Sequence, residues 1–153
     1  MKEFVIHVNQ TNLPLSSQIK PSIFEANTFL ANKKPTLIEY AAFYGSIQIF
    51  QYLKMNNIEL KPSLWPFVIH SNSQELFDLL EKEKIELNYE ECLRESIKCH
   101  HNSIASYIRE NYSITAKNDK VTEDNFCHRN ILDYSFKYHN FALFPDNLND
   151  PFI

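Results

Sequence analysis

The chain has 153 residues but only one glycine, Gly45. Phosphate-binding loops need several glycines close together so that backbone amides can approach the phosphate groups. The sequence therefore excludes a glycine-rich nucleotide site. It also predicts a particular role for Gly45, because glycine adopts left-handed backbone conformations at no steric cost and is favoured where a helix ends.

Cysteine is also scarce, and the three cysteines are Cys92, Cys99 and Cys127. An odd number at irregular spacing does not fit the disulfide framework of a small secreted protein. Free thiols in a reducing compartment are the simpler interpretation, so we expect a cytoplasmic protein. The N-terminal residues, which lack a long apolar stretch and a small-residue cleavage site, show no signal-peptide pattern.

An excess of positive charge and long hydrophobic runs are absent as well. The chain carries 15 lysines and arginines against 19 acidic residues, for a net charge of −4. Nucleic-acid-binding domains usually have a clustered basic face, whereas the basic residues here are scattered, so we expect no nucleic-acid partner. No apolar run approaches the roughly 18–20 residues of a membrane span, so we expect no membrane partner either. Hydrophobic residues make up 44% of the chain, which is typical of a folded domain.

The clearest structural signal lies between Thr36 and Leu60, which reads as two helices joined by a tight turn. Thr36 followed by Glu39 predicts a capping box at the start of the first helix. Gly45 lies where this helix must end, and Asn57, which also tolerates a left-handed backbone, follows the second helix. The apolar positions at helical spacing are Leu37, Tyr40, Ala41 and Tyr44, then Ile49, Phe50, Tyr52 and Leu53.

This hairpin pattern is repeated along the chain. Pro35-Thr36-Leu37-Ile38 recurs 27 residues later as Pro62-Ser63-Leu64-Trp65, and Ile58-Glu59-Leu60 recurs as Ile85-Glu86-Leu87. In this second copy Asn72 takes the place of Gly45, an exchange that preserves a residue suited to the left-handed turn.

Two further copies are weaker. The third has a first helix at 91–99, a turn at His100-His101-Asn102 with a register defined to within one or two residues, and a second helix containing Ile104-Ala105 and Tyr107-Ile108. In the fourth, residues 130–140 align one for one with residues 36–46. Phe141 to Phe144 begin its second helix, which Pro145 ends.

The remaining segments carry weaker signals. Phe4, Ile6 and Val8 alternate with their neighbours, which predicts a short strand, and residues 9–21 read as a loop. Residues 22–32 predict a helix that covers the first repeat. Residues 111–125 are polar and predict an extended loop. The tail at 145–153 ends on apolar Phe152-Ile153, and since a repeat array normally closes with a polar face, we expect the native protein to continue.

The core from Thr36 to Ser46, Thr-Leu-x-x-x-Ala-Ala-x-x-Gly-Ser, and the following Ile-Phe-x-Tyr-Leu-x-x-x-Asn resemble the ankyrin repeat. Leu37 and Ile38 replace the familiar Pro-Leu, Glu39 and Ser46 replace the two histidines, and Asn57 replaces the second glycine. The period of 27–28 residues is shorter than the usual value of about 33, as in divergent short-loop arrays. The resemblance covers residues 35–144, with repeats at 35–61, 62–88, 89–114 and 129–144, an N-terminal segment with a capping helix at 1–34 and a tail at 145–153.

The resemblance implies an all-α, ankyrin-like solenoid of about four helical hairpins that binds another protein through its concave face and loops. Candidate partner-binding residues lie near the exposed ends of the first helices, or one turn earlier for Trp65 and Arg94: Phe43, Tyr44, Trp65, His70, Ser71, Arg94, Lys98, Cys99, Lys137 and Tyr138. Aromatic residues and arginine are enriched in binding hot spots. The alternative is that the large aromatics pack against neighbouring repeats. A second functional hypothesis is a structural spacer in a larger multidomain protein whose activity lies elsewhere.

Metal binding and catalysis have little support in the sequence. Cys99-His100-His101 and Cys127-His128 contain zinc-type ligands, but there is no Cys-x-x-Cys pair, and the expected helix between the two groups separates them by about 12–15 Å. No catalytic signature surrounds Cys99, His100, Glu90 or Glu91. We therefore expect no enzymatic activity, no cofactor, no metal and no small-molecule substrate.

Overall fold

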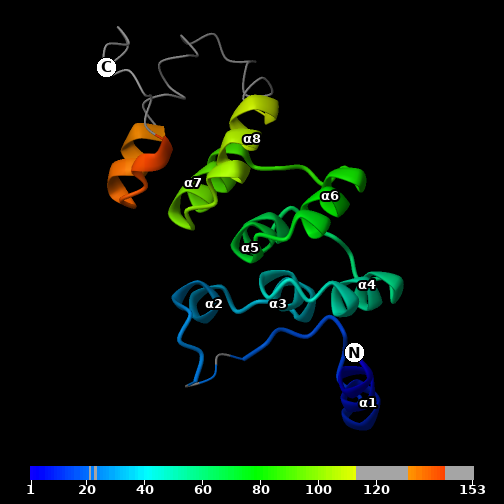
Figure 1. The fold of residues 1–153 in the computed structure, drawn as a ribbon. Coiled ribbons are helices and arrows are strands. Elements are labelled where there is room, and N and C mark those ends of the chain that lie inside the picture. Colours follow the sequence, from blue (N-terminus) through cyan, green and yellow to red (C-terminus); the bar gives the residue numbers. More distant parts are fainter. Residues whose placement is uncertain (21, 23, 113–130, 144–153) are drawn as a thin grey trace, which may run out of the picture. The chain divides into compact units, whose positions relative to one another are not determined.

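The computed structural model describes residues 1–20, 22, 24–112 and 131–143 (Figure 1). Within these residues the regular elements are helices, which confirms the all-α prediction, and a single isolated bridge pairs Gln18 with Thr36. The helices are α1 (Lys2–Thr11), α2 (Thr28–Lys33), α3 (Leu37–Phe43), α4 (Ile47–Met55), α5 (Leu64–Ser71), α6 (Gln74–Lys82), α7 (Tyr89–Lys98), α8 (Asn102–Tyr112) and the 3-10 helix η1 (Phe141–Leu143), and residues 131–137 are also helical. No helix among the described residues has both the length and the apolar character needed to cross a membrane.

The chain divides into two compact units, Met1–Glu86 and Leu87–Ile153. The first unit contains α1 to α6. The second contains α7, α8, the helix at 131–137 and η1.

The first hairpin of the Met1–Glu86 unit begins with the predicted capping box. The Thr36 backbone N–H donates to Glu39 Oε2 at 2.8 Å, and the Glu39 N–H donates to Thr36 Oγ1 at 3.4 Å. Two of the otherwise unpaired donors at the helix start are thereby satisfied. The capping prediction is confirmed, and it fixes where α3 begins.

Each first helix ends in the same left-handed turn. The turn residues are Gly45, Asn72, His100 and His139, with φ values of 60°, 52°, 59° and 55°. This finding confirms that Asn72 takes the same left-handed conformation as Gly45, places the third turn at His100 and shows a left-handed residue at His139 as well. Of these residue types only glycine avoids the steric cost of this conformation, so the turns at Asn72, His100 and His139 form against some strain.

Backbone hydrogen bonds close these turns in a repeated way. The residue after the left-handed residue donates back to a carbonyl five positions earlier: Ser46 to Ala41 at 2.8 Å, His101 to Ser96 at 2.9 Å and Asn140 to Ser135 at 2.9 Å. In the second hairpin the Ser71 hydroxyl mediates this link, because it accepts from the Ser73 N–H at 3.2 Å and donates to the Val68 carbonyl at 2.8 Å. These bonds satisfy carbonyls that the end of a helix leaves without an intrahelical partner.

Packing within the first unit joins the two hairpins through their first helices. Helix α3 contacts both α4 and α5, and α5 contacts α6. Ala41 and Ala42, which are 5% and 0% exposed, allow another helix to approach α3 closely. The apolar core of the unit includes Phe50, Leu53, Leu64, Val68, Leu76 and Leu80.

The N-terminal residues differ from the prediction. The expected strand at Phe4, Ile6 and Val8 is wrong, because these residues lie in helix α1. Tertiary contacts decide the outcome: the Phe4 ring lies edge-on to Tyr52 of α4 at 6.0 Å, and Val8 is buried. The capping helix predicted at 22–32 is shorter than expected and is represented by α2, which Asn27 caps by accepting from the N–H groups of Phe29 and Leu30.

Helix α1 also ends in the same way as the second helices of the hairpins. Asn12 has a φ of 50°, and the Leu13 N–H donates to the Val8 carbonyl at 3.3 Å. The ends of α4 and α6 show the same pair of features, with Ile58 donating to Leu53 at 3.2 Å and Ile85 to Leu80 at 3.1 Å. The sequences after these turns also agree: Leu13-Pro14-Leu15, Ile58-Glu59-Leu60 and Ile85-Glu86-Leu87. Helix α1 therefore has the local form of a second helix of a hairpin.

In the second unit, α7 and α8 form a hairpin, and the buried side chain of Asn140 fastens the following segment to it. Asn140 Nδ2 donates to the Ile97 carbonyl at 2.9 Å and to Asn102 Oδ1 at 2.7 Å. Helix α7 begins two residues before the predicted start at Glu91, because Asn88 caps it by accepting from the Glu91 N–H. Helix α8 extends to Tyr112, into the predicted loop; the rest of that loop and the tail at 145–153 lie outside the described residues.

Candidate functional site

Five aromatic or imidazole side chains gather on helices α2, α3 and α5 of the first unit. Phe43 and His70 occupy equivalent positions in the two hairpins, and their rings stack with centroids 5.2 Å apart and planes inclined by 29°. Phe29 of α2 adds a third ring, 4.1 Å from His70 and 5.9 Å from Phe43. We call Phe29, Tyr40, Phe43, Tyr44 and His70 the aromatic surface.

Tyr44 is the most exposed member of the aromatic surface, with 54% of its surface accessible. It follows the last residue of α3, and its ring contacts Tyr40 at 4.9 Å and Phe43 at 5.1 Å. The Tyr40 hydroxyl donates to Glu25 Oε2 at 3.4 Å. A side-chain hydrogen bond with Tyr44, together with burial and the Glu25 charge, raises the pKa of Tyr40 to about 12. Tyr40 is therefore a neutral hydrogen-bonding group at physiological pH.

Trp65 is not at the surface, which corrects its assignment as a partner-binding residue. Its side chain is completely buried, its ring lies edge-on to Phe77 at 5.0 Å, and its Nε1–H donates to the Ile85 carbonyl at 3.2 Å. The packing alternative therefore holds for this residue. Trp65 is equivalent to Ile38, which the structure buries although the predicted apolar face of the first helix was Leu37, Tyr40, Ala41 and Tyr44.

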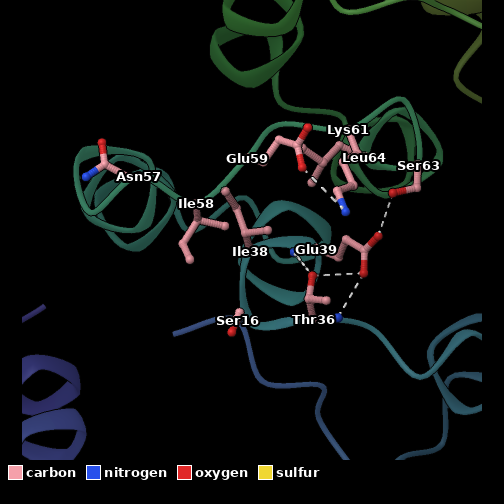
Figure 2. Close-up of a pocket in the computed structure, with 10 residues that line it drawn as sticks. All are labelled: Ser16, Thr36, Ile38, Glu39, Asn57, Ile58, Glu59, Lys61, Ser63 and Leu64. Atoms are coloured by element: carbon pink, nitrogen blue, oxygen red, sulfur yellow. Dashed lines mark hydrogen bonds and ion pairs between the residues drawn. The ribbon is translucent and has the colours of Figure 1, made fainter. Parts of the chain in front are cut away.

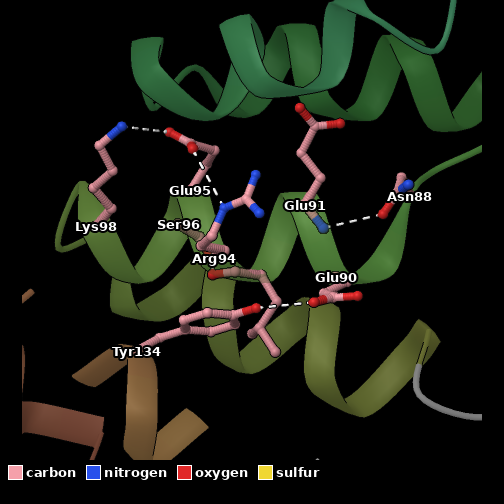
Figure 3. Close-up of polar contacts among 9 residues, drawn as sticks. Asn88, Glu90, Glu91, Arg94, Glu95, Ser96, Lys98 and Tyr134 are labelled. Atoms are coloured by element: carbon pink, nitrogen blue, oxygen red, sulfur yellow. Dashed lines mark hydrogen bonds and ion pairs between the residues drawn. The ribbon is translucent and has the colours of Figure 1, made fainter. Parts of the chain in front are cut away.

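The second unit places Arg94 and Lys98 on either side of a buried carboxylate (Figure 3). Glu95 is only 7% exposed, and its carboxylate lies 3.7 Å from Arg94 Nε and 3.2 Å from Lys98 Nζ. A buried charge is costly unless it is paired, so these two cations have a structural task in addition to any surface role. Glu95 was not among the predicted residues; its position between the inward-facing pairs Cys92-Leu93 and Ser96-Ile97 was the available signal.

Lys137 and Tyr138 adjoin each other at the end of the helix at 131–137. Lys137 Nζ lies 5.5 Å from the centroid of the Tyr138 ring, within the range of a cation–π contact. One turn earlier, the Tyr134 hydroxyl donates to Glu90 Oε1 at 3.0 Å (Figure 3). Burial, followed by this hydrogen bond, raises the pKa of Tyr134. The tyrosine repeats the arrangement of Tyr40 with Glu25, since Tyr134 and Tyr40 are equivalent positions.

The thiols of Cys92 and Cys99 are poorly suited to nucleophilic chemistry. Burial, followed by the charges of Glu91 and Glu95, raises the pKa of Cys92 to about 12. Burial and Glu95 raise the pKa of Cys99 to about 11. Since the thiolate is the reactive and metal-binding form, both groups are unreactive near neutral pH. Cys127 and His128, the other ligands considered for zinc, lie outside the described residues.

A pocket of about 270 Å³ opens beside the starts of α3 and α5 (Figure 2). Phe43, Tyr44 and His70 of the aromatic surface lie at the other ends of these helices. The apolar lining of the pocket comes from Ile38, Ile58 and Leu64, and its polar lining includes Glu39 and Glu59. The Glu39 carboxylate is held on two sides, because Oε2 accepts from Thr36 and Oε1 accepts from the Ser63 hydroxyl at 2.8 Å. The same carboxylate thus caps α3 and links the first hairpin to the second, a contact that the capping pattern alone did not predict.

Comparison of the chain with protein-family models, with curated proteins and with solved structures finds no match.

Proposed function

We propose that this chain is a protein–protein interaction module built as an ankyrin-like array of helical hairpins. The repeated left-handed turns at Gly45, Asn72, His100 and His139 support this architecture, as does the matching hydrogen bond that closes three of them. Stacked hairpins of this kind share a core with their neighbours and present the ends of their first helices as an extended surface. A cytoplasmic location is part of the proposal and is based on the odd number of cysteines.

The observation that carries the proposal is the exposure of Tyr44 above a packed aromatic layer. Tyrosine provides a large, rigid contact area and a hydroxyl group, and it is enriched at the centres of protein interfaces. Phe43 and the stacked ring of His70 hold the surface around Tyr44 in place. A partner that covers Tyr44 therefore gains apolar contact without the cost of ordering a flexible side chain.

The second unit carries cations at the corresponding positions. Lys98 and Lys137 are equivalent to Phe43 and His70, and their side chains are exposed. Charges at the rim of an interface mainly affect the rate of association and the choice of partner, whereas buried aromatic anchors provide affinity. We therefore assign the anchoring role to Tyr44 in the first unit and, within the second unit by itself, a steering role to Lys98 and Lys137.

Quantitative affinity purification from the native cells tests this proposal. The bait proteins are the wild-type chain, Tyr44→Ala and the control Met55→Ala, which removes a side chain that is 82% exposed on α4, a second helix. We expect Tyr44→Ala to reduce the recovery of specific partners at least about tenfold, as for a hot-spot residue, while Met55→Ala leaves it unchanged. Circular dichroism of both variants verifies that the helices are retained.

Equal recovery with all three baits would contradict the proposed role of Tyr44. If the wild-type chain also retained no specific partner, the spacer hypothesis would be favoured. A domain attached to the chain would then hold the activity.

A further inference from the structure

The pocket beside Ile38 has a filled counterpart in the next hairpin. In the repeat register, Trp65 is equivalent to Ile38 and Ile85 is equivalent to Ile58. The Trp65 indole is completely buried and donates its N–H to the Ile85 carbonyl at 3.2 Å. An indole therefore occupies the space between these two positions in the second hairpin.

The first hairpin has only an isoleucine at the same place. Ile38 has a smaller side chain and no N–H donor, and the pocket of about 270 Å³ opens next to it and to Ile58 (Figure 2). No hydrogen bond from the described part of the chain reaches the Ile58 carbonyl. The first hairpin thus lacks both the ring and the hydrogen bond that Trp65 provides in the second.

The size and lining of the pocket suit one amino-acid side chain. Small-molecule sites usually have volumes of about 300–1,000 Å³, so this pocket lies just below that range. Ile38 and Leu64, which are 3% and 1% exposed, form the apolar floor. The three hydrogen bonds to Glu39 from Thr36 and Ser63 hold the wall in position, so little ordering is needed on binding.

The electrostatics of the rim favour the edge of an aromatic ring that carries a donor. Two carboxylates, from Glu39 and Glu59, face one ammonium group, from Lys61, which lies 3.5 Å from Glu59. The edge of an aromatic ring is electropositive, and the N–H of an indole is its most positive point. An aliphatic side chain would fill the floor but offer the rim carboxylates no donor, and a guanidinium group would place a full charge against Ile38 and Leu64.

We propose that this pocket binds a tryptophan side chain of the partner protein, which takes the place that Trp65 occupies in the second hairpin. The inference rests on the proposed protein-binding function. It adds a second, chemically defined anchor at the end of the first helices opposite Tyr44. The indole lies on Ile38 and Leu64, and its N–H points to the acceptors at the rim.

Binding of N-acetyl-tryptophanamide to the full chain tests the proposal, with amide chemical shifts as the readout. We expect saturable shifts at Thr36, Glu39 and Ile58 with roughly millimolar affinity, as is normal for one isolated side chain. N-acetyl-leucinamide and N-acetyl-argininamide are the comparison probes. We expect both to bind at least about tenfold more weakly, which corresponds to the loss of one good contact.

The variant Ile38→Trp supplies the missing indole from within the chain and is expected to abolish binding of the probe. The matched control is Met55→Trp, which adds an indole at an exposed position of α4 and should leave binding unchanged. Ser16 is an exposed loop residue that lines the pocket. The variant Ser16→Phe places a larger side chain there, so it tests the site without changing the core. It is expected to weaken binding by a smaller factor.

Several results would overturn the assignment. Tighter binding of N-acetyl-argininamide would identify a cation pocket instead, and retention of full affinity in both Ile38→Trp and Ser16→Phe would place the probe elsewhere. If probe binding held but excess N-acetyl-tryptophanamide failed to displace a partner captured through Tyr44, a partner tryptophan would be ruled out. Probe binding without any Tyr44-dependent partner would support the pocket as a binding site for an indole. It would contradict only the proposed role of the aromatic surface.

Discussion

The two units of this chain use the same hairpin and fill its exposed positions with different chemistry. At one repeat position the first unit has Phe43 and His70, which stack on each other, whereas the second has Lys98 and Lys137. The turn that follows is nevertheless the same in both units, with φ between 52° and 60°. The left-handed turn is therefore a requirement of the hairpin. The side chain at the repeat position before the turn is not fixed by the hairpin and can differ between the two units.

The units also differ in the kinds of side chain that they bury. The first unit buries the indole of Trp65 completely. The second uses polar groups inside: Glu95 lies between Arg94 and Lys98, and Asn140 bonds to α7 and α8. Apolar packing tolerates small shifts in geometry, whereas a buried polar group depends on the placement of each partner. We expect mutations to reveal this contrast.

The largest effect is expected for Trp65→Ala in the first unit. Removal of a buried indole costs about 3–5 kcal/mol, and it also leaves the Ile85 carbonyl without its donor. Urea unfolding followed by circular dichroism measures the change. Trp65→Phe is the control that retains a ring, and a loss with alanine no greater than that with phenylalanine would contradict the packing role.

A smaller effect is expected for Asn140→Ala in the second unit. The substitution leaves the Ile97 carbonyl and Asn102 Oδ1 without their shared donor, which costs about 1–3 kcal/mol for buried groups. Hydrogen exchange of the amides in α7 and α8 measures the loss of protection. The equivalent position in the first unit is Ser46, where alanine should cost less because the Ser46 side chain is only half-buried. Equal costs at the two positions would show that the buried amide has no special role.

Substitutions at the turn residues compare the two units through smaller expected changes in the free energy of unfolding. Gly45→Ala places an L-residue at a φ of 60° and should cost about 1–2 kcal/mol, since its Cβ would meet only ordinary contacts at 3.8 and 3.9 Å. His100→Gly relieves strain in the second unit but adds freedom to the unfolded chain, so its net effect should be under about 1 kcal/mol. Denaturation midpoints of the two variants measure this asymmetry. A neutral Gly45→Ala would mean that the hairpin adjusts its turn.

The smallest effect at neutral pH involves the Cys92 thiol. Its pKa is raised to about 12 in the folded chain by burial, so the unfolded state ionises first as the pH rises. The contribution of this group to stability is fully present below its ordinary pKa and is lost progressively as the pH increases toward about 12. Tyr40, whose pKa is also raised, adds to the loss at the upper end of this window.

Urea midpoints at neutral and strongly alkaline pH measure this dependence. The variant Cys92→Ala, which has no thiol to ionise at this position, should show a shallower decline than the wild type. An identical pH profile would contradict the assignment to Cys92.

Much of the local structure could be predicted from short sequence patterns. The Thr36 and Glu39 pair fixed the start of α3, and the alignment of Gly45 with Asn72 identified two left-handed turns before their φ values were known. The alternation of Phe4, Ile6 and Val8 favours a strand, yet these residues form α1. The sequence signal for this helix is the Asn12-Leu13-x-Leu15 pattern, which matches Asn57-Ile58-x-Leu60 and indicates the end of a helix.

The sites were harder to predict than the hairpins. Tyr44 was expected at an exposed helix end and is exposed, whereas Trp65 was assigned to the surface by residue type and is buried. The burial of Glu95 and Asn140 was not predicted at all. Polar residues are usually exposed, so their burial depends on partners that a single repeat does not reveal.

The sequence by itself determined the elements whose causes lie within about five residues: the capping box at Thr36 and the left-handed turns. These depend on backbone sterics and on hydrogen bonds to near neighbours, which any window of the sequence contains. Only the tertiary structure decided that Phe29 joins Phe43 and His70, that Asn140 bonds to Ile97, and that Trp65 bonds to Ile85 while a pocket opens beside Ile38 and Ile58. Each of these depends on how separate helices meet, and that is set by packing across long stretches of the chain.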